Sequence, residues 1–151
     1  MENAVKALLM AAGVLIGILI LSLGVTLYSA LSSYTEESQR NIEQNALNTF
    51  NAQFTGYLRD DLTIQDVVTV ANIAYENNRN YEVDSLDENS YYVQVILDDG
   101  SGVERQIENI IHTDAGELLK NNLENTFECT NDNIQFSQIT GRVISIKFVK
   151  K

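Results

Sequence analysis

Residues 7–31 contain no charged side chain, and this apolar run lies close to the start of the chain. As an α-helix the run would be about 37 Å long, which exceeds the hydrocarbon core of a bilayer, about 30 Å thick. The chain contains no proline that would break such a helix. The run therefore predicts a single membrane-spanning helix, and every other element has to be compatible with it.

A secretory signal peptide is the alternative interpretation of this run. Its apolar stretch is about 7 to 15 residues long, follows a basic segment and ends at small residues. Residues 30–32 resemble such a cleavage site, but the run is longer and Lys6 is the only basic side chain before it. We therefore expect a retained span with a cytoplasmic N-terminus, because Lys6 and the α-amine flank one end and Glu36 and Glu37 the other.

The helical pattern continues beyond the span. Apolar side chains recur every four residues, which is the spacing of one helix face; they are Ile42, Ala46, Phe50, Phe54 and Leu58. We predict one long helix with a transmembrane half, residues 1–31, and an amphipathic half, residues 32–58. The side chains of Ile42, Phe50, Phe54 and Leu58 are expected to form a helix–sheet core with the rest of the chain.

Residues 59–151 are long enough for one small globular head domain. Thr63 and Asp66 predict a capping box before an amphipathic helix that ends near residue 80, and Asp114 is expected to cap a shorter helix. Runs of β-forming residues predict an antiparallel sheet. The predicted strands are residues 91–97, 103–110, 127–129, 134–139 and 143–149.

The last predicted strand alternates apolar and polar side chains, and we expect Ile144, Ile146 and Phe148 to face the long helix. The predicted fold class is therefore α+β, with a long N-terminal helix packed on a small antiparallel sheet. This arrangement resembles type IV pilins and pseudopilins. The resemblance covers the whole chain as a pattern, and at residue level it is confined to the N-terminal segment, where the chain lacks the proline common in pilin spans. Residues 50–57 and 140–148 are also similar to uncharacterised small membrane proteins of Gram-positive bacteria.

The pilin resemblance assigns a role to Glu2. In that family an acidic residue near the N-terminus is thought to pair with a neighbouring subunit's N-terminal amine inside the filament, and Glu2 is the carboxylate placed to do so. A charge in an apolar environment is tolerated chiefly when it is paired. The alternative is that Glu2 is an ordinary solvated residue beside the membrane.

Small residues mark a second candidate assembly feature. Gly13 and Gly17 lie four residues apart on one helix face, and Gly24 is a further small position. Helices in a membrane associate through close packing, for which such positions provide room. Lipid-facing glycines without a role are the alternative, because this spacing arises often in apolar segments.

The charge and the reactive residues argue against several functions. A net charge of −11 disfavours nucleic acid and anionic membrane surfaces as partners. His112 and Cys129 are the only residues of their types, which excludes a His-based metal cluster or an intrachain disulfide, and we expect both to be structural. The acidic segment 98–102 predicts a hairpin turn rather than a calcium loop. We expect neither a cofactor nor enzymatic activity.

Two functions remain as predictions. The resemblance implies a structural subunit of a type IV pilus-like extracellular filament, which is a helical homopolymer assembled through the N-terminal helix after residence in membrane lipid. The alternative is a single-pass accessory or interaction protein that does not polymerise, such as a minor pseudopilin or a component of a secretion or conjugation machine.

Overall fold

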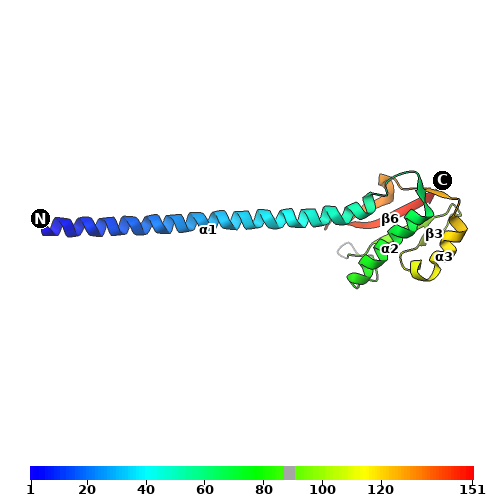
Figure 1. Cartoon of the computed structure of the whole chain (residues 1–151), viewed down its shortest axis with the longest axis horizontal. Coiled ribbons are helices and arrows are strands. Elements are labelled where there is room, and N and C mark those ends of the chain that lie inside the picture. The colour runs from blue at the N-terminus through cyan, green and yellow to red at the C-terminus, as the bar shows by residue number, and fades with distance from the viewer. Residues whose placement is uncertain (87–90) are drawn as a thin grey trace. The chain divides into compact units, whose positions relative to one another are not determined.

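The computed structural model describes residues 1–86 and 91–151, apart from the side chains of residues 112 and 113. The α+β fold class is confirmed, because a long N-terminal helix and a small sheet are both present (Figure 1). The chain divides into two compact units, Met1–Asn45 and Ala46–Lys151. The elements are α1 (Glu2–Thr55), β1 (Leu62–Thr63), α2 (Ile64–Asn80), β2 (Gln94–Asp98), β3 (Glu104–Gln106), α3 (Ile111–Asn122), β4 (Thr126–Glu128), the 3-10 helix η1 (Asn131–Asn133), β5 (Ile134–Phe136) and β6 (Val143–Lys150).

Helix α1 is continuous, as the unbroken periodicity predicted, and it has no break at Gly17 or Gly24. It ends three residues before the predicted end at Leu58, because Gly56 is a weak helix former and the chain turns there. In this turn the Tyr57 N–H donates a hydrogen bond to the Phe54 carbonyl at 3.1 Å. Residues 46–55 of the helix belong to the second unit.

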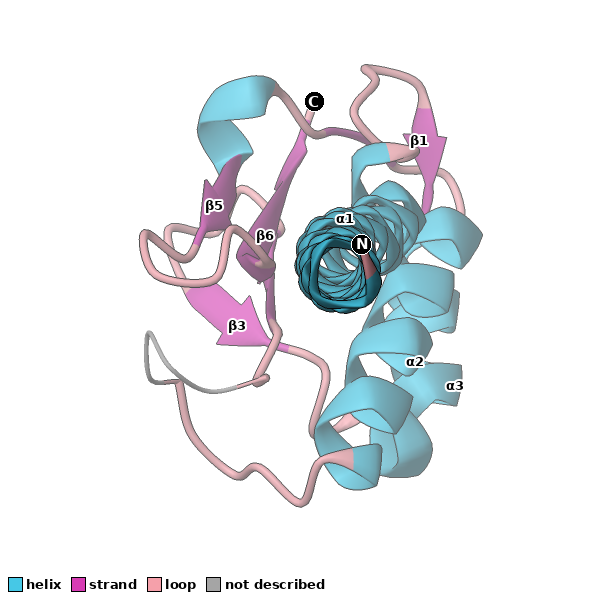
Figure 2. Cartoon of the chain, turned by 90° about the vertical axis from the view of Figure 1, so that its left-hand side faces the viewer, coloured by secondary structure: helices cyan, strands magenta, loops and turns pink. Residues whose placement is uncertain are grey.

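Helices α2 and α3 lie on one side of the second unit, with β3, β5 and β6 on the other (Figure 2). The predicted capping box of α2 is present: the Thr63 N–H donates to Asp66 Oδ2 at 2.9 Å, and the Asp66 N–H donates to Thr63 Oγ1 at 3.4 Å. The predicted cap of α3 is wrong. This helix begins at Ile111 after Ile110, and Asp114 lies within its first turn.

The sheet is mixed, where a purely antiparallel one was expected. Its strand order is β1-β4-β6-β2-β3, and β5 also pairs with β6. The hairpin of β2 and β3 is antiparallel, as predicted, but β2 and β6 run parallel, with Val95 opposite Ile146. A parallel pair requires a long crossover connection, and the chain between β2 and β6 supplies it through β3, α3, β4 and β5.

The core of the second unit lies between the sheet, α2 and the end of α1. Phe54, Ile146 and Phe148 are fully buried in it, and Phe50 and Leu58 are half-buried against it. Among the described residues, the largest other fully buried apolar side chains are Phe127, Leu62, Ile64, Leu97, Ile107, Val67, Val70 and Val93.

Two predicted core residues lie outside this core. Ile42 is 65% exposed, because each step of four residues turns the helix by about 40° beyond one full turn. Three such steps therefore separate its face from that of Phe54. Ile144 is half-buried and does not pack on the core, because the register between β5 and β6 shifts at this point and pairs Phe136 with Val143. Val143, which is 1% exposed, takes the core position.

Candidate functional site

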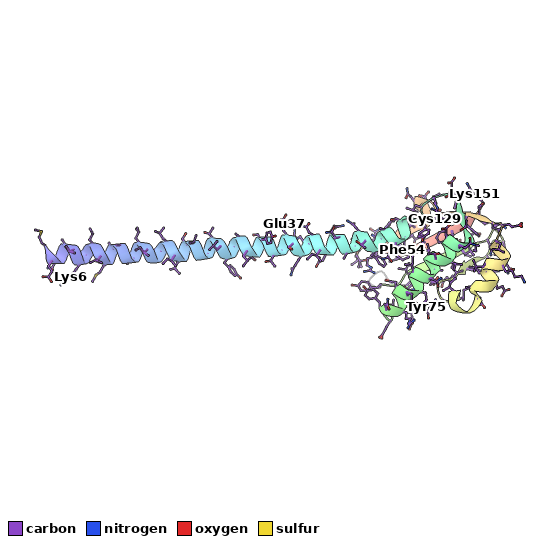
Figure 3. All side chains as sticks on the ribbon, in the orientation of Figure 1. Lys6, Glu37, Phe54, Tyr75, Cys129 and Lys151 are labelled. Carbon is purple, nitrogen blue, oxygen red and sulfur yellow. The ribbon has the colours of Figure 1, made fainter. Side chains whose placement is uncertain are left out.

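The apolar helix of the first unit is the main candidate site. Among the described residues one helix, α1, is long and apolar enough to cross a membrane; its most apolar window has a mean hydropathy of 2.7, and none of that window is buried. Side chains project from this helix along its length, and those of Lys6 and Glu37 are labelled in Figure 3. An apolar helix that is not buried in its own chain requires lipid or other helices as its surroundings.

The glycines form one open face of this helix. Gly13, Gly17 and Gly24 fall within a sector of about 40° of the helix circumference, and Lys6 lies in the same sector. Among the residues that the structure describes, a Cβ atom added at Gly13, Gly17 or Gly24 would meet nothing within 4 Å. The fold of the single chain therefore does not require glycine at these positions, whereas a closely packed neighbouring helix would.

Three hydroxyl groups in this part of α1, those of Thr26, Ser33 and Thr35, donate hydrogen bonds to carbonyl groups of the preceding helical turn. Thr26 Oγ1 donates to the Ser22 carbonyl at 2.8 Å, and Ser33 Oγ donates to the Ser29 carbonyl at 3.0 Å. An unsatisfied polar group is costly in hydrocarbon. These internal hydrogen bonds make the hydroxyl groups at these positions compatible with a lipid or helix-packed environment.

Glu2 is paired within its own chain. Its Oε1 lies 2.9 Å from Lys6 Nζ, and both side chains are exposed. Such an exposed pair contributes little to stability in water, but it neutralises two charges that would be costly in an apolar environment. The structure thus gives Glu2 a partner that the sequence interpretation did not consider.

Asn51 joins the last turns of α1 to the start of β6. Its side-chain Nδ2 donates to the Gly141 carbonyl at 2.9 Å, and its Oδ1 accepts a hydrogen bond from the Val143 N–H at 3.0 Å. Gly141 adopts a φ of +69°, which favours glycine. Leu47 lies 3.4 Å from the point that a Cβ at Gly141 would occupy.

Asn78 makes the equivalent connection between α2 and the segment that leads into β2. Its Nδ2 donates to the Val93 carbonyl at 2.9 Å, and its Oδ1 accepts from the Val93 N–H at 2.7 Å. The two asparagines therefore attach two helices to the N-terminal ends of two neighbouring parallel strands. Sequence reasoning missed both residues, because an asparagine within a helix carries no local signal of a distant backbone partner.

Arg142 holds together aromatic side chains from three parts of the second unit. Its guanidinium carbon lies 3.7 Å from the ring centroid of Phe50 and 4.3 Å from that of Tyr91, and Tyr91 stacks on Tyr81 at 4.2 Å. Within the described part of the chain Arg142 forms no ion pair, and its buried Nε has no hydrogen-bond partner. Cation–π contacts of this kind stabilise the packing.

A buried carboxylate lies beneath β2. Glu108 is fully buried, and its oxygens accept hydrogen bonds from the Tyr92 hydroxyl at 2.8 Å and from the Val95 N–H at 2.9 Å. Burial, together with the hydrogen bond to Glu108, raises the pKa of Tyr92 to about 12. These contacts fix the start of β2 to the segment after β3.

The residues with reactive side chains form no catalytic arrangement in the described part of the chain. Burial raises the pKa of Cys129 to about 11, so the thiol is protonated at neutral pH and is a poor nucleophile. The side chain of His112 lies outside the described residues. Among the residues that the structure describes, no group of His, Cys, Asp and Glu side chains is placed to hold a metal ion.

The acidic segment 98–102 forms a turn. Asp99 Oδ1 accepts a hydrogen bond from the Ser101 N–H at 3.0 Å, and Gly100 and Gly102 have φ values of +80° and +81°. These are the features of a glycine-containing connection between two strands. The turn joins β2 to β3, which is the hairpin that the sequence predicted.

Comparison with known proteins leaves the family of this chain open. No protein-family model, no curated protein and no solved structure matches it. The exposed helix of the first unit and the surfaces of the second unit are therefore the features from which a function can be inferred.

Proposed function

We propose that this protein is a single-pass membrane protein, with its N-terminus in the cytoplasm, that assembles into a type IV pilus-like filament. The N-terminal helix packs against the same helix of other copies, and the second unit is displayed on the cell surface. The feature that carries this proposal is the open face of α1, on which a Cβ atom at Gly13, Gly17 or Gly24 would contact none of the described residues within 4 Å.

Helix packing explains why the residues on this face have no side chain larger than a hydrogen atom at positions 13, 17 and 24. Lipid tails are as apolar as leucine side chains, so helices leave lipid for one another only where their backbones approach closely. A glycine within a helix destabilises it in water by about 1 kcal/mol relative to alanine. Three such residues on one face are useful if a second helix occupies it.

A head-to-tail contact between identical chains generates a filament when the repeated rotation does not close into a ring. In this arrangement a neighbour's N-terminal amine would share Glu2 with Lys6, which already lies 2.9 Å from it. The net charge of −11 keeps the displayed surfaces soluble and mutually repulsive, so the attraction has to come from the helices.

The Glu2–Lys6 pair also favours a second candidate function. Because Glu2 is already paired within its chain, it does not require a neighbour's amine in order to enter an apolar environment. The chain would then remain in the membrane as a single-pass accessory protein of a secretion or conjugation machine.

Electron microscopy of sheared cell surfaces separates the two functions. Cells that express the chain at a high level in the membrane fraction should release thin filaments, and an antibody against the second unit should label them. Membrane-resident protein without filaments would contradict the filament proposal and favour the accessory protein.

Variants at Glu2 and Lys6 test the role of the charges. We expect Glu2→Ala to reduce the filament yield more than Lys6→Ala, because the first leaves a neighbour's amine unpaired in an apolar core, which costs several kcal/mol. The yield is measured against the protein level in the membrane fraction. Equal losses in both single variants, with no further loss in the double variant, would show that Glu2 serves only Lys6.

A further inference from the structure

A groove of about 450 Å³ lies in the second unit between the end of α1 and α2. Phe50 and Ile73 supply apolar surface in it, and polar side chains line the rest, namely Gln53, Asn72, Glu76, Asn77 and Asn80. Its volume falls within the range of small-molecule binding sites. The groove plays no part in the proposed assembly of the first unit.

Three of the four amides that line this groove are available for a ligand. Among the described residues, the side chains of Gln53, Asn72 and Asn80 make no hydrogen bond, whereas Asn77, which also lines the groove, donates one to the Tyr91 carbonyl. Each amide offers an acceptor oxygen and two N–H donors. Three unpaired amides around one groove can therefore contact a ligand that alternates donors and acceptors, as a hydroxyl group does.

The groove is close to neutral in a strongly acidic chain. Its one carboxylate, Glu76, lies 3.8 Å from Arg79, whereas the chain as a whole carries a net charge of −11. None of the described residues that line the groove has a cationic side chain that could bind an anion. This lining favours an uncharged ligand.

One aromatic ring, that of Phe50, lines the groove, and the Tyr91 carbonyl accepts a hydrogen bond from Asn77 in the lining. Phe50 lines the groove and is held in place by Arg142, which also contacts Tyr91. Tyr91 is 43% exposed and stacks on Tyr81, which is 50% exposed and directly follows Asn80. Tyrosine combines a flat apolar face with a polar hydroxyl. This pair lies outside the lining of the groove, so it offers exposed aromatic surface only to a ligand that is long enough to extend beyond the groove.

We propose that this groove binds an uncharged oligosaccharide. The amides would bind hydroxyl groups, and the aromatic rings would contact the C–H faces of the sugar. An extended peptide is less well matched, because peptides commonly add to a strand edge or fill side-chain pockets, and this groove lies between two helices. Binding here is independent of filament assembly, so failure of one proposal leaves the other intact.

The test uses the full chain in phosphatidylcholine nanodiscs, since glycoside detergents would compete for the groove. The labelled protein is applied to an array of uncharged oligosaccharides, acidic oligosaccharides and immobilised peptides, and the affinity for the best probe is measured by calorimetry. We expect binding to uncharged oligosaccharides. The double variant Gln53→Ala/Asn72→Ala should weaken it about tenfold through the loss of two groups of hydrogen bonds.

The control is the double variant Gln135→Ala/Gln138→Ala, which removes exposed amides outside the groove and should leave the affinity unchanged. Asn80→Ala, at the exposed end of α2, should also weaken binding and is not expected to affect folding. The proposal is overturned if uncharged oligosaccharides do not bind, if acidic probes or peptides alone bind, or if the groove variants bind like the parent.

Discussion

At the scale of single residues, Phe54 connects α1 to the core of the second unit. It is fully buried, and its ring lies 5.3 Å from that of Phe50. We expect Phe54→Ala to lower the free energy of unfolding by about 3 to 5 kcal/mol, because it removes a large side chain and leaves a cavity. Denaturant unfolding of the second unit within the full chain measures this effect. Phe136→Ala, at a position that is 42% exposed, should have a much smaller effect, and similar effects would contradict the assignment.

Cys129 provides a test of burial by chemistry. Its pKa is raised from 9.0 to about 11 by burial, so the thiolate fraction at pH 8 is small. Iodoacetamide should therefore modify the native chain slowly and the denatured chain quickly. Rapid native modification would contradict the buried position.

The raised pKa of Cys129 also predicts how the stability of the fold changes with pH. The neutral thiol is favoured by the fold, so its contribution is fully present below pH 9 and is lost as the pH rises from 9 to 11. Replacement by alanine or serine should flatten this part of the stability curve, measured as the unfolding midpoint against pH. Tyr92, with a pKa of about 12, should continue the loss at higher pH.

Some residue positions could be predicted from the sequence and others could not. The fourfold spacing identified Phe54, but it misplaced Ile42, because repeated steps of four drift around the helix. The alternation of β6 identified Ile146 and Phe148, but the register shift opposite Phe136 put Val143 in place of Ile144. A register shift depends on the partner strand, which the local pattern does not contain.

At the scale of elements, two asparagines attach helices to strands. Asn51 binds the backbone at Gly141 and Val143, and Asn78 binds both backbone groups of Val93. We expect Asn51→Ala and Asn78→Ala each to lower the free energy of unfolding by about 1 to 3 kcal/mol, because they leave backbone groups without partners. The effect at Asn78 should be the larger, since its side chain is buried.

The matched control for these two variants is Asn80→Ala, which changes an exposed asparagine of α2 without removing such a hydrogen bond. Its unfolding midpoint should equal that of the parent. Equal destabilisation by all three variants would show that the asparagines act through helix propensity rather than through their contacts with the strands.

The elements themselves were predicted best where the signal is local. The capping box of Thr63 and Asp66 gave the start of α2, and the acidic, glycine-containing turn gave the hairpin of β2 and β3. The parallel pairing of β2 with β6 was missed, because it joins strands that are far apart in the chain. Local periodicity identifies a strand, but which strand it pairs with depends on the path of the whole chain.

At the scale of the whole molecule, the sequence predicted a long N-terminal helix followed by a small α+β domain, because an uncharged run and a continuing helical period are strong signals. It could not reveal the groove beside Phe50, which depends on the meeting of α1 and α2. The pairing of Glu2 with Lys6, by contrast, follows the i, i+4 spacing that the sequence already contains. Each of these features arises from contacts between side chains.

The most direct test of the central claim is the effect of Gly17→Leu on filament yield, measured from sheared cells at an equal level of protein in the membrane fraction. A Cβ at Gly17 meets nothing within 4 Å in the described part of its own chain, so we attribute a loss of filaments at equal membrane level to the contact with a neighbouring copy. Ala11→Leu is the control, because it adds similar bulk on a different face of the same helix, about 120° away. We expect Gly17→Leu to reduce the filament yield at least tenfold and Ala11→Leu to leave it unchanged. Filament yields equal to the parent in both variants would contradict assembly through the glycine face of α1.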